Sequence, residues 1–141
     1  MKSCLIVEDN PVVRGIIVEI LHDLAITPIE VENADAGVLY CVDSKPDVVL
    51  LDWDLPSMAA LDFLRGVGEL SQDQRPEIIL SATENDPRQF SLASAAGARH
   101  HILKPFDKPL LAAKLSEMGI LDAQEGSSEI NSESGDLEQS A

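Results

Sequence analysis

The stretch VVLLDWDLP, residues 48–56, decides the fold that the sequence predicts. It opens with four apolar residues, and such a uniformly apolar run is typical of a strand covered on both faces, as in a parallel sheet between helices. The run leads directly into two carboxylates, Asp52 and Asp54. Because the carboxyl ends of strands in such a sheet carry the functional site, these acids are the first candidates for it.

Strand-like and helix-like segments alternate on either side of this stretch. The predicted strands are residues 4–7, 27–31, 48–51, 78–81 and 101–103. The predicted helices begin at Pro11 behind the cap Asn10, after Asn33, at about Leu61, after Asp86 (ending at Gly97) and after Asp107. In the first helix an apolar stripe consists of Val13, Ile16, Ile17, Ile20, Leu21 and Leu24. The alternation predicts an α/β fold with a doubly wound, five-stranded parallel sheet and five helices.

The composition indicates one folded domain and a different C-terminal segment. A chain of 141 residues with 45% hydrophobic residues is large enough for a single core. Residues 122–141 contain six acids, five serines and no basic residue, and their sparse apolar residues do not offset the chain entropy lost on folding. We therefore expect a domain at 1–121 and an acidic, Ser-rich disordered tail at 122–141, with no output domain.

Charge and cysteine usage exclude several classes of partner. The net charge of −15 disfavours direct binding to DNA or to an anionic membrane surface. No apolar run approaches the roughly 20 residues that span a bilayer. Cys4 and Cys41 lie in apolar contexts without C-x-x-C spacing, which favours buried free thiols over a disulfide or a structural metal. These features predict a cytoplasmic protein.

Chemically capable groups lie at the ends of four predicted strands: Glu8 and Asp9 at the first, Asp52 at the third, Ser81 at the fourth and Lys104 at the fifth. Crowded carboxylates repel unless a cation lies among them, and hard oxygen ligands without a full protein cage suit Mg²⁺. A carboxylate beside such an ion can attack phosphorus and give an aspartyl phosphate. A nearby ammonium then neutralises charge on the phosphoryl group, and a hydroxyl can donate a hydrogen bond to it.

Each of these residues has an ordinary interpretation when it is taken alone. Glu8 and Asp9 could lead into a helix cap, and Asp52 could simply end a strand. Ser81 could satisfy local backbone, and Lys104 could be a solvated surface lysine. Independent causes would have to place all five residues at the same edge of one sheet. The combination therefore favours a single functional site.

Four motifs give the chain a specific resemblance to a known family: LIVEDN, VVLLDWDLP, IILSA and AGARHHILKPF, in this order. From residue 1 to about 121 the sequence resembles the receiver domain of two-component response regulators, of the stand-alone kind found in chemotaxis. The resemblance implies a flavodoxin-like fold with strand order 2-1-3-4-5. It implies that Asp52 is the phosphoacceptor, that Lys104 pairs with the phosphoryl group, and that the Lys104–Pro105 peptide bond is cis. The implied Mg²⁺ ligands are Glu8, Asp9, Asp52 and the backbone carbonyl of Asp54.

The identity of the switch hydroxyl stays open at this point. The family places a hydroxyl at the end of the fourth strand, which matches Ser81 when counted from Pro76. Counting back from Lys104 instead reaches Ala82, which suggests one extra residue in the loop. Ser81 is the preferred candidate, and Thr83 is the alternative.

Two further positions depart from the family pattern. The position that usually holds an aromatic switch residue on the fifth strand holds His101, which could also be an ordinary histidine on an edge strand. The loop after the phosphoacceptor contains Ala59 and Ala60 where the family typically has Asp-Gly. Losing the glycine predicts reduced backbone freedom in that loop.

The function that the resemblance implies is a phosphorylation-dependent signalling switch of a two-component system or phosphorelay, and not a turnover enzyme. The implied phosphodonor is a histidine kinase or histidine phosphotransfer protein. The implied output surface comprises strand four, helix four, strand five and helix five, on a monomer or weak dimer. Two alternatives are a pseudo-receiver that binds partners without phosphate and a haloacid-dehalogenase-type phosphatase, whose nucleophile motif also resembles DWD. The retained acids and Lys104 disfavour the first, and the short chain disfavours the second.

Overall fold

The computed structural model describes residues 2–121 of the chain. Its internal contacts divide the chain into two compact units, one spanning Met1–Pro105 and the other beginning at Phe106. Every residue of the predicted site lies in the first unit. The predicted tail at 122–141 lies outside the described residues, so the boundary at residue 121 stays a prediction.

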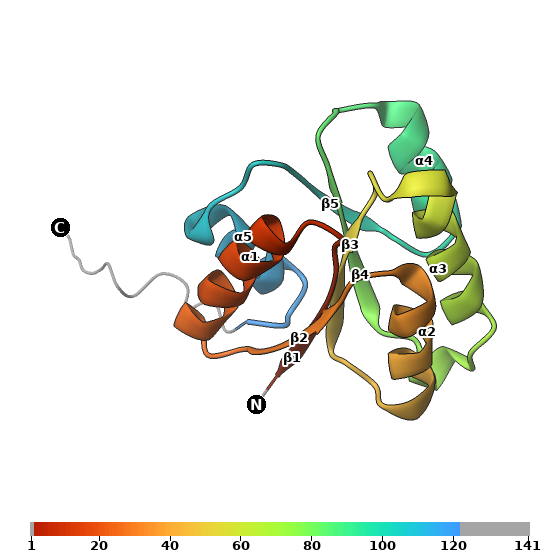
Figure 1. Cartoon of the computed structure of the whole chain (residues 1–141), viewed down its shortest axis with the longest axis horizontal. Coiled ribbons are helices and arrows are strands. Elements are labelled where there is room, and N and C mark those ends of the chain that lie inside the picture. Colours follow the sequence, from red (N-terminus) through yellow and green to blue (C-terminus); the bar gives the residue numbers. More distant parts are fainter. Residues whose placement is uncertain (1, 122–141) are drawn as a thin grey trace, which may run out of the picture. The chain divides into compact units, whose positions relative to one another are not determined.

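The first unit is built on a five-stranded parallel sheet (Figure 1). Its strands are β1 (Ser3–Val7), β2 (Thr27–Val31), β3 (Val48–Asp52), β4 (Glu77–Ala82) and β5 (His100–Leu103). The order β2-β1-β3-β4-β5 confirms the predicted flavodoxin-like, doubly wound fold. The predicted strand ranges agree with these bounds to within one residue at each end.

Four helices accompany the sheet in the first unit: α1 (Pro11–Asp23), α2 (Ala34–Asp43), α3 (Ala59–Gly68) and α4 (Pro87–Ala95). Figure 1 shows α1 on one side of the sheet and α2, α3 and α4 on the other. The second unit contributes α5 (Lys108–Glu117). The caps explain where these helices begin: Asn10 accepts from the amides of Val12 and Val13, and Asn33 accepts from Ala36.

The central strands are buried because both faces of the sheet are covered. All five residues of β3 are buried. On one face, Leu51 belongs to a core cluster with Phe63 and Leu64 of α3. Cys4 and Cys41 are buried free thiols, as predicted, and burial raises their pKa values to about 12 and about 11. Among residues 2–121 no helix is long and apolar enough to cross a membrane.

The predicted apolar stripe of α1 is wrong at one residue. Ile17, Ile20 and Leu21 are buried, whereas Ile16 is 54% exposed. Successive residues advance about 100° around a helix axis. Among the residues of the stripe, Ile16 therefore lies furthest from the buried Ile17 and Leu21, at the edge of the stripe.

The loop after β3 also differs from the expectation. A short 3₁₀ turn, Pro56–Met58, precedes α3, so that α3 begins at Ala59 and not at Leu61. Ala59 is right-handed, with φ −62°, a conformation that needs no glycine. The left-handed residues are Ser57 and Met58, both with φ 59°. Backbone strain therefore falls on these two positions, ahead of the alanines that replace the family's Asp-Gly.

Candidate functional site

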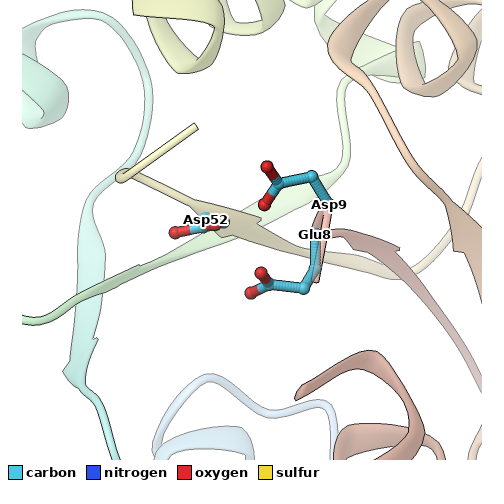
Figure 2. Close-up of side chains that lie close together, drawn as sticks. All are labelled: Glu8, Asp9 and Asp52. Atoms are coloured by element: carbon cyan, nitrogen blue, oxygen red, sulfur yellow. The ribbon is translucent and has the colours of Figure 1, made fainter. Parts of the chain in front are cut away.

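Three carboxylates converge at the carboxyl ends of β1 and β3. Glu8 and Asp9 directly follow β1, Asp52 ends β3, and the two strands are paired up to Val7 and Leu51. Parallel neighbours end at the same edge of the sheet, which brings the three acids together although about 43 residues separate them along the chain. One oxygen from each side chain lies within 4.8 Å of the others. Figure 2 shows the three side chains around one common space.

Burial distinguishes the three acids. Glu8 and Asp52 are each only 3% exposed, whereas Asp9 is exposed. Burial, together with the negative charge of Asp52, raises the pKa of Glu8 to about 7. Glu8 Oε1 is also buried without a hydrogen-bond partner among the described residues. A buried carboxylate oxygen in this state fits a cation ligand, and the all-carboxylate donor set suits Mg²⁺.

Lys104 supplies the positive charge of the site. It follows β5, and its amide donates to the carbonyl of Ala82 over 2.8 Å. Its Nζ lies 3.0 Å from Asp52 Oδ1, 3.6 Å from Glu8 Oε1 and 3.8 Å from Asp54 Oδ2. Burial opposes the charged form of Lys104, but the hydrogen bond to Asp52 and the negative charges of Asp52, Glu8 and Asp54 together outweigh burial and raise the pKa of Lys104. The Lys104–Pro105 peptide bond is cis.

The two candidate switch hydroxyls have different surroundings. Ser81 is buried and is the register partner of Asp52 on the neighbouring strand. Its Oγ donates a long hydrogen bond of 3.5 Å to the carbonyl of Leu51. Thr83 is exposed, and its Oγ1 donates to Asp54 Oδ2 over 3.2 Å. Ser81 is therefore the hydroxyl beside the phosphoacceptor candidate, whereas Thr83 contacts the second acid of DWD.

Two side-chain contacts in the loops around Asp52 were not predicted. The Thr83 amide, like its hydroxyl, donates to Asp54 Oδ2 over 3.2 Å. The indole Nε1 of Trp53 donates to Gln89 Oε1 of α4 over 3.1 Å. These pairs lie 29 and 36 residues apart, and no local sequence pattern signals them. The Asp54 amide donates to Asp52 Oδ1 over 2.9 Å, so the loop is anchored on the phosphoacceptor candidate itself.

His101 lies on β5, three residues before Lys104. Its side chain is exposed and stacks on Phe90 of α4, with ring centroids 3.9 Å apart and an interplanar angle of 15°. The histidine therefore takes part in a contact between β5 and α4 and does not project alone into solvent.

A comparison with known families shows to which family the chain belongs. Residues 4–116, which are most of the chain, match the family "Response regulator receiver domain". The chain belongs to the receiver domain family. It is accordingly not a conventional enzyme, and its pocket of Glu8, Asp9 and Asp52 with Lys104 is consistent with the phosphoacceptor site of a receiver domain.

Individual relatives support this assignment of the receiver domain. The phosphate regulon transcriptional regulatory protein PhoB of Pseudomonas aeruginosa is 34% identical over 116 residues, which cover 81% of this chain and 50% of PhoB. The chain thus spans about half the length of such relatives. The chemotaxis protein CheY of the same organism is 27% identical over 115 residues, covering 81% of this chain and 93% of CheY.

Solved structures show the same fold. Chemotaxis response regulator CheY4 of Vibrio cholerae matches with a TM-score of 0.76 and 24% identity, over 83% of this chain and 98% of that one. The receiver domain of sensor histidine kinase PA1611 from Pseudomonas aeruginosa matches with a TM-score of 0.74 and 24% identity, over 82% of this chain and 95% of that one. That structure has a magnesium ion coordinated in its active site cleft.

Proposed function

We propose that this receiver domain is a phosphorylation-dependent signalling switch in which Asp52 accepts the phosphoryl group. The observation that carries the proposal is the contact of 3.0 Å between Lys104 Nζ and Asp52 Oδ1, inside a cluster of three carboxylates. A fixed ammonium beside a buried carboxylate is placed to neutralise the charge that an arriving phosphoryl group brings.

The proposed reaction is a transfer of one phosphoryl group to Asp52. A carboxylate oxygen of Asp52 attacks phosphorus, a new O–P bond forms, and the donor's P–N or P–O bond breaks with its electron pair staying on the leaving group. Lys104 pairs with the phosphoryl oxygens. We assign the switch hydroxyl to Ser81, because its strand is in register with Asp52 and the Thr83 hydroxyl already contacts Asp54.

The proposed cofactor is Mg²⁺. Glu8, Asp9 and Asp52 would hold the ion, with the backbone carbonyl of Asp54 as a further ligand. Glu8 Oε1, which is buried and accepts no hydrogen bond among the described residues, supports this proposal, and so does the magnesium-containing receiver domain of PA1611. When bound, the ion would neutralise the crowded carboxylates and the transferred phosphoryl oxygens.

The proposed partners are a histidine kinase or histidine phosphotransfer protein as donor and a downstream protein as target. Receiver domains partner with histidine kinases, and phosphohistidine supplies the P–N bond of the reaction above. We place the output surface on α4 and β5 and assign the switch role to His101, because its ring joins the two elements through Phe90. The free, buried thiols of Cys4 and Cys41 support a cytoplasmic setting for this exchange.

Labelling with acetyl phosphate and Mg²⁺ tests the proposal. We expect intact-protein mass spectrometry to show one added phosphoryl group on the wild type and none on Asp52→Asn. Asp62→Asn is the matched control, because Asp62 is exposed on α3 and pairs only with Arg65 among the contacts of the described residues. Stoichiometric phosphate on the Asp52→Asn variant would overturn the assignment, and so would a wild type that stays unlabelled, as a pseudo-receiver would.

A further inference from the structure

The turn that carries Glu8 and Asp9 lies beyond the regular part of the sheet. β1 ends at Val7, which pairs with Val31 of β2 and Leu51 of β3. One residue later, the amide of Glu8 reaches the carbonyl of Val31 only over 3.4 Å. Strand pairing therefore holds the two acids weakly, so contacts from outside the sheet contribute to the orientation of this turn. One of them is the hydrogen bond of 3.2 Å from the Asn10 amide to Glu8 Oε2.

The guanidinium of Arg14 supplies a contact to the backbone of this turn. Its Nη1 donates to the backbone carbonyl of Glu8 over 2.8 Å. Its Nε donates to Oε1 of Glu30 on β2 over 3.3 Å. The Arg14 side chain is only 16% exposed, whereas that of Glu30 is 51% exposed. A guanidinium is rigid and planar. The hydrogen bond from Nε to Glu30 therefore fixes the direction of Nη1, which points toward the turn of Glu8 and Asp9.

The Glu8 carbonyl is an effective point at which to hold both acids. It belongs to the peptide unit between Glu8 and Asp9, and a peptide unit is planar. One hydrogen bond to its oxygen therefore orients the plane from which both side chains project. Asp52 belongs to a different strand, so a rotation of this plane would move Glu8 and Asp9 together relative to Asp52 (Figure 2).

We propose that Arg14 is a positioning residue for the cation site, which fixes the peptide between Glu8 and Asp9 so that their carboxylates face Asp52. This inference rests on the proposed function, because it concerns the same Mg²⁺ site. The positioning effect of Arg14 can be distinguished from the effect of its positive charge. A guanidinium near the site repels a cation, so that losing the charge alone would tighten Mg²⁺ binding, whereas losing the positioning would weaken it.

Calorimetric titration of the full chain with MgCl₂, without any phosphodonor, tests the sign of the effect. We expect Arg14→Gln to raise the Kd for Mg²⁺ by about three- to tenfold, which is at or below the lower limit of the roughly 10–100-fold loss caused by removing groups behind metal ligands. Arg65→Gln is the matched control, since it removes the same charge from an exposed pair on α3 and should change the Kd by less than about twofold. Glu30→Gln keeps the donor to Glu8 and should have a smaller effect than Arg14→Gln.

A second variant covers the case in which Arg14→Gln does not fold, as judged by circular dichroism. Arg14→Lys keeps the positive charge but loses the planar guanidinium with its two donors. We expect its Kd for Mg²⁺ to exceed that of the wild type. Unchanged or tighter Mg²⁺ binding in a folded Arg14 variant would overturn this inference while leaving the proposed function intact. A wild type that binds no Mg²⁺ would overturn the proposed function, and the inference with it.

Discussion

At the scale of single residues, the second acid of DWD has a position that connects it to phosphoryl lifetime. Asp54 Oδ2 lies 3.8 Å from Lys104 Nζ and accepts hydrogen bonds from the amide and hydroxyl of Thr83. A carboxylate held there can orient an attacking water and accept its proton, which an amide cannot do as well. It also repels an anionic phosphoryl group on Asp52. Asp54 should therefore shorten the life of the phosphorylated form.

We predict that Asp54→Asn slows autodephosphorylation at least threefold, which corresponds to a rise of at least about 0.65 kcal/mol in the barrier. Labelling of Asp52 should remain possible in this variant. The decay of the phosphorylated form is followed through the fluorescence of Trp53, which lies between the two acids in the sequence and donates a hydrogen bond to Gln89. Thr83→Val should give a smaller effect, because it removes the hydroxyl and leaves the amide bond to Asp54. Equal decay in Asp54→Asn would mean that this carboxylate takes no part in hydrolysis, and faster decay would mean that it protects the aspartyl phosphate; either result contradicts the prediction.

At the scale of the elements, sequence patterns predict what is local and miss what depends on packing. The caps Asn10 and Asn33 and the uniformly apolar strands were predicted, because each signal is contained in a few consecutive residues. The meeting of Glu8, Asp9 and Asp52 was predicted because parallel strands share an edge. The contacts of Arg14 with Glu30 and of Trp53 with Gln89 join different elements through side-chain rotamers, which no periodicity specifies.

The exposed position of Ile16 gives an element-scale prediction for α1. Ile17 is 2% exposed and Ile16 is 54% exposed, although both belong to the predicted apolar stripe. Ile17→Ala should lower the free energy of unfolding by about 2–4 kcal/mol, because it leaves a cavity in the core. Ile16→Ala should lower it by less than about 1 kcal/mol. Urea denaturation measures both, and equal losses in the two variants would contradict this placement of the helix.

At the scale of the whole molecule, every residue assigned to the site lies in the unit Met1–Pro105. The acids of residues 122–141 are absent from the proposed chemistry, and the composition of that segment offers no apolar face. We predict that deleting residues 122–141 leaves the melting temperature and the extent of labelling nearly unchanged. Differential scanning calorimetry of the full and shortened chains provides the comparison. A large fall in melting temperature would show that the segment contributes to the fold.

The location of the phosphoryl group tests the central claim most directly. Borohydride reduces an aspartyl phosphate to homoserine, so peptide mass spectrometry of the reduced, acetyl-phosphate-labelled protein identifies the acceptor by its position. We predict homoserine at residue 52 and no reduced side chain at any other acid of the site. Homoserine at residue 9 or 54, or 5-hydroxynorvaline at residue 8, which is the product of a reduced glutamyl phosphate, would contradict this prediction. So would phosphate on a residue that borohydride does not reduce.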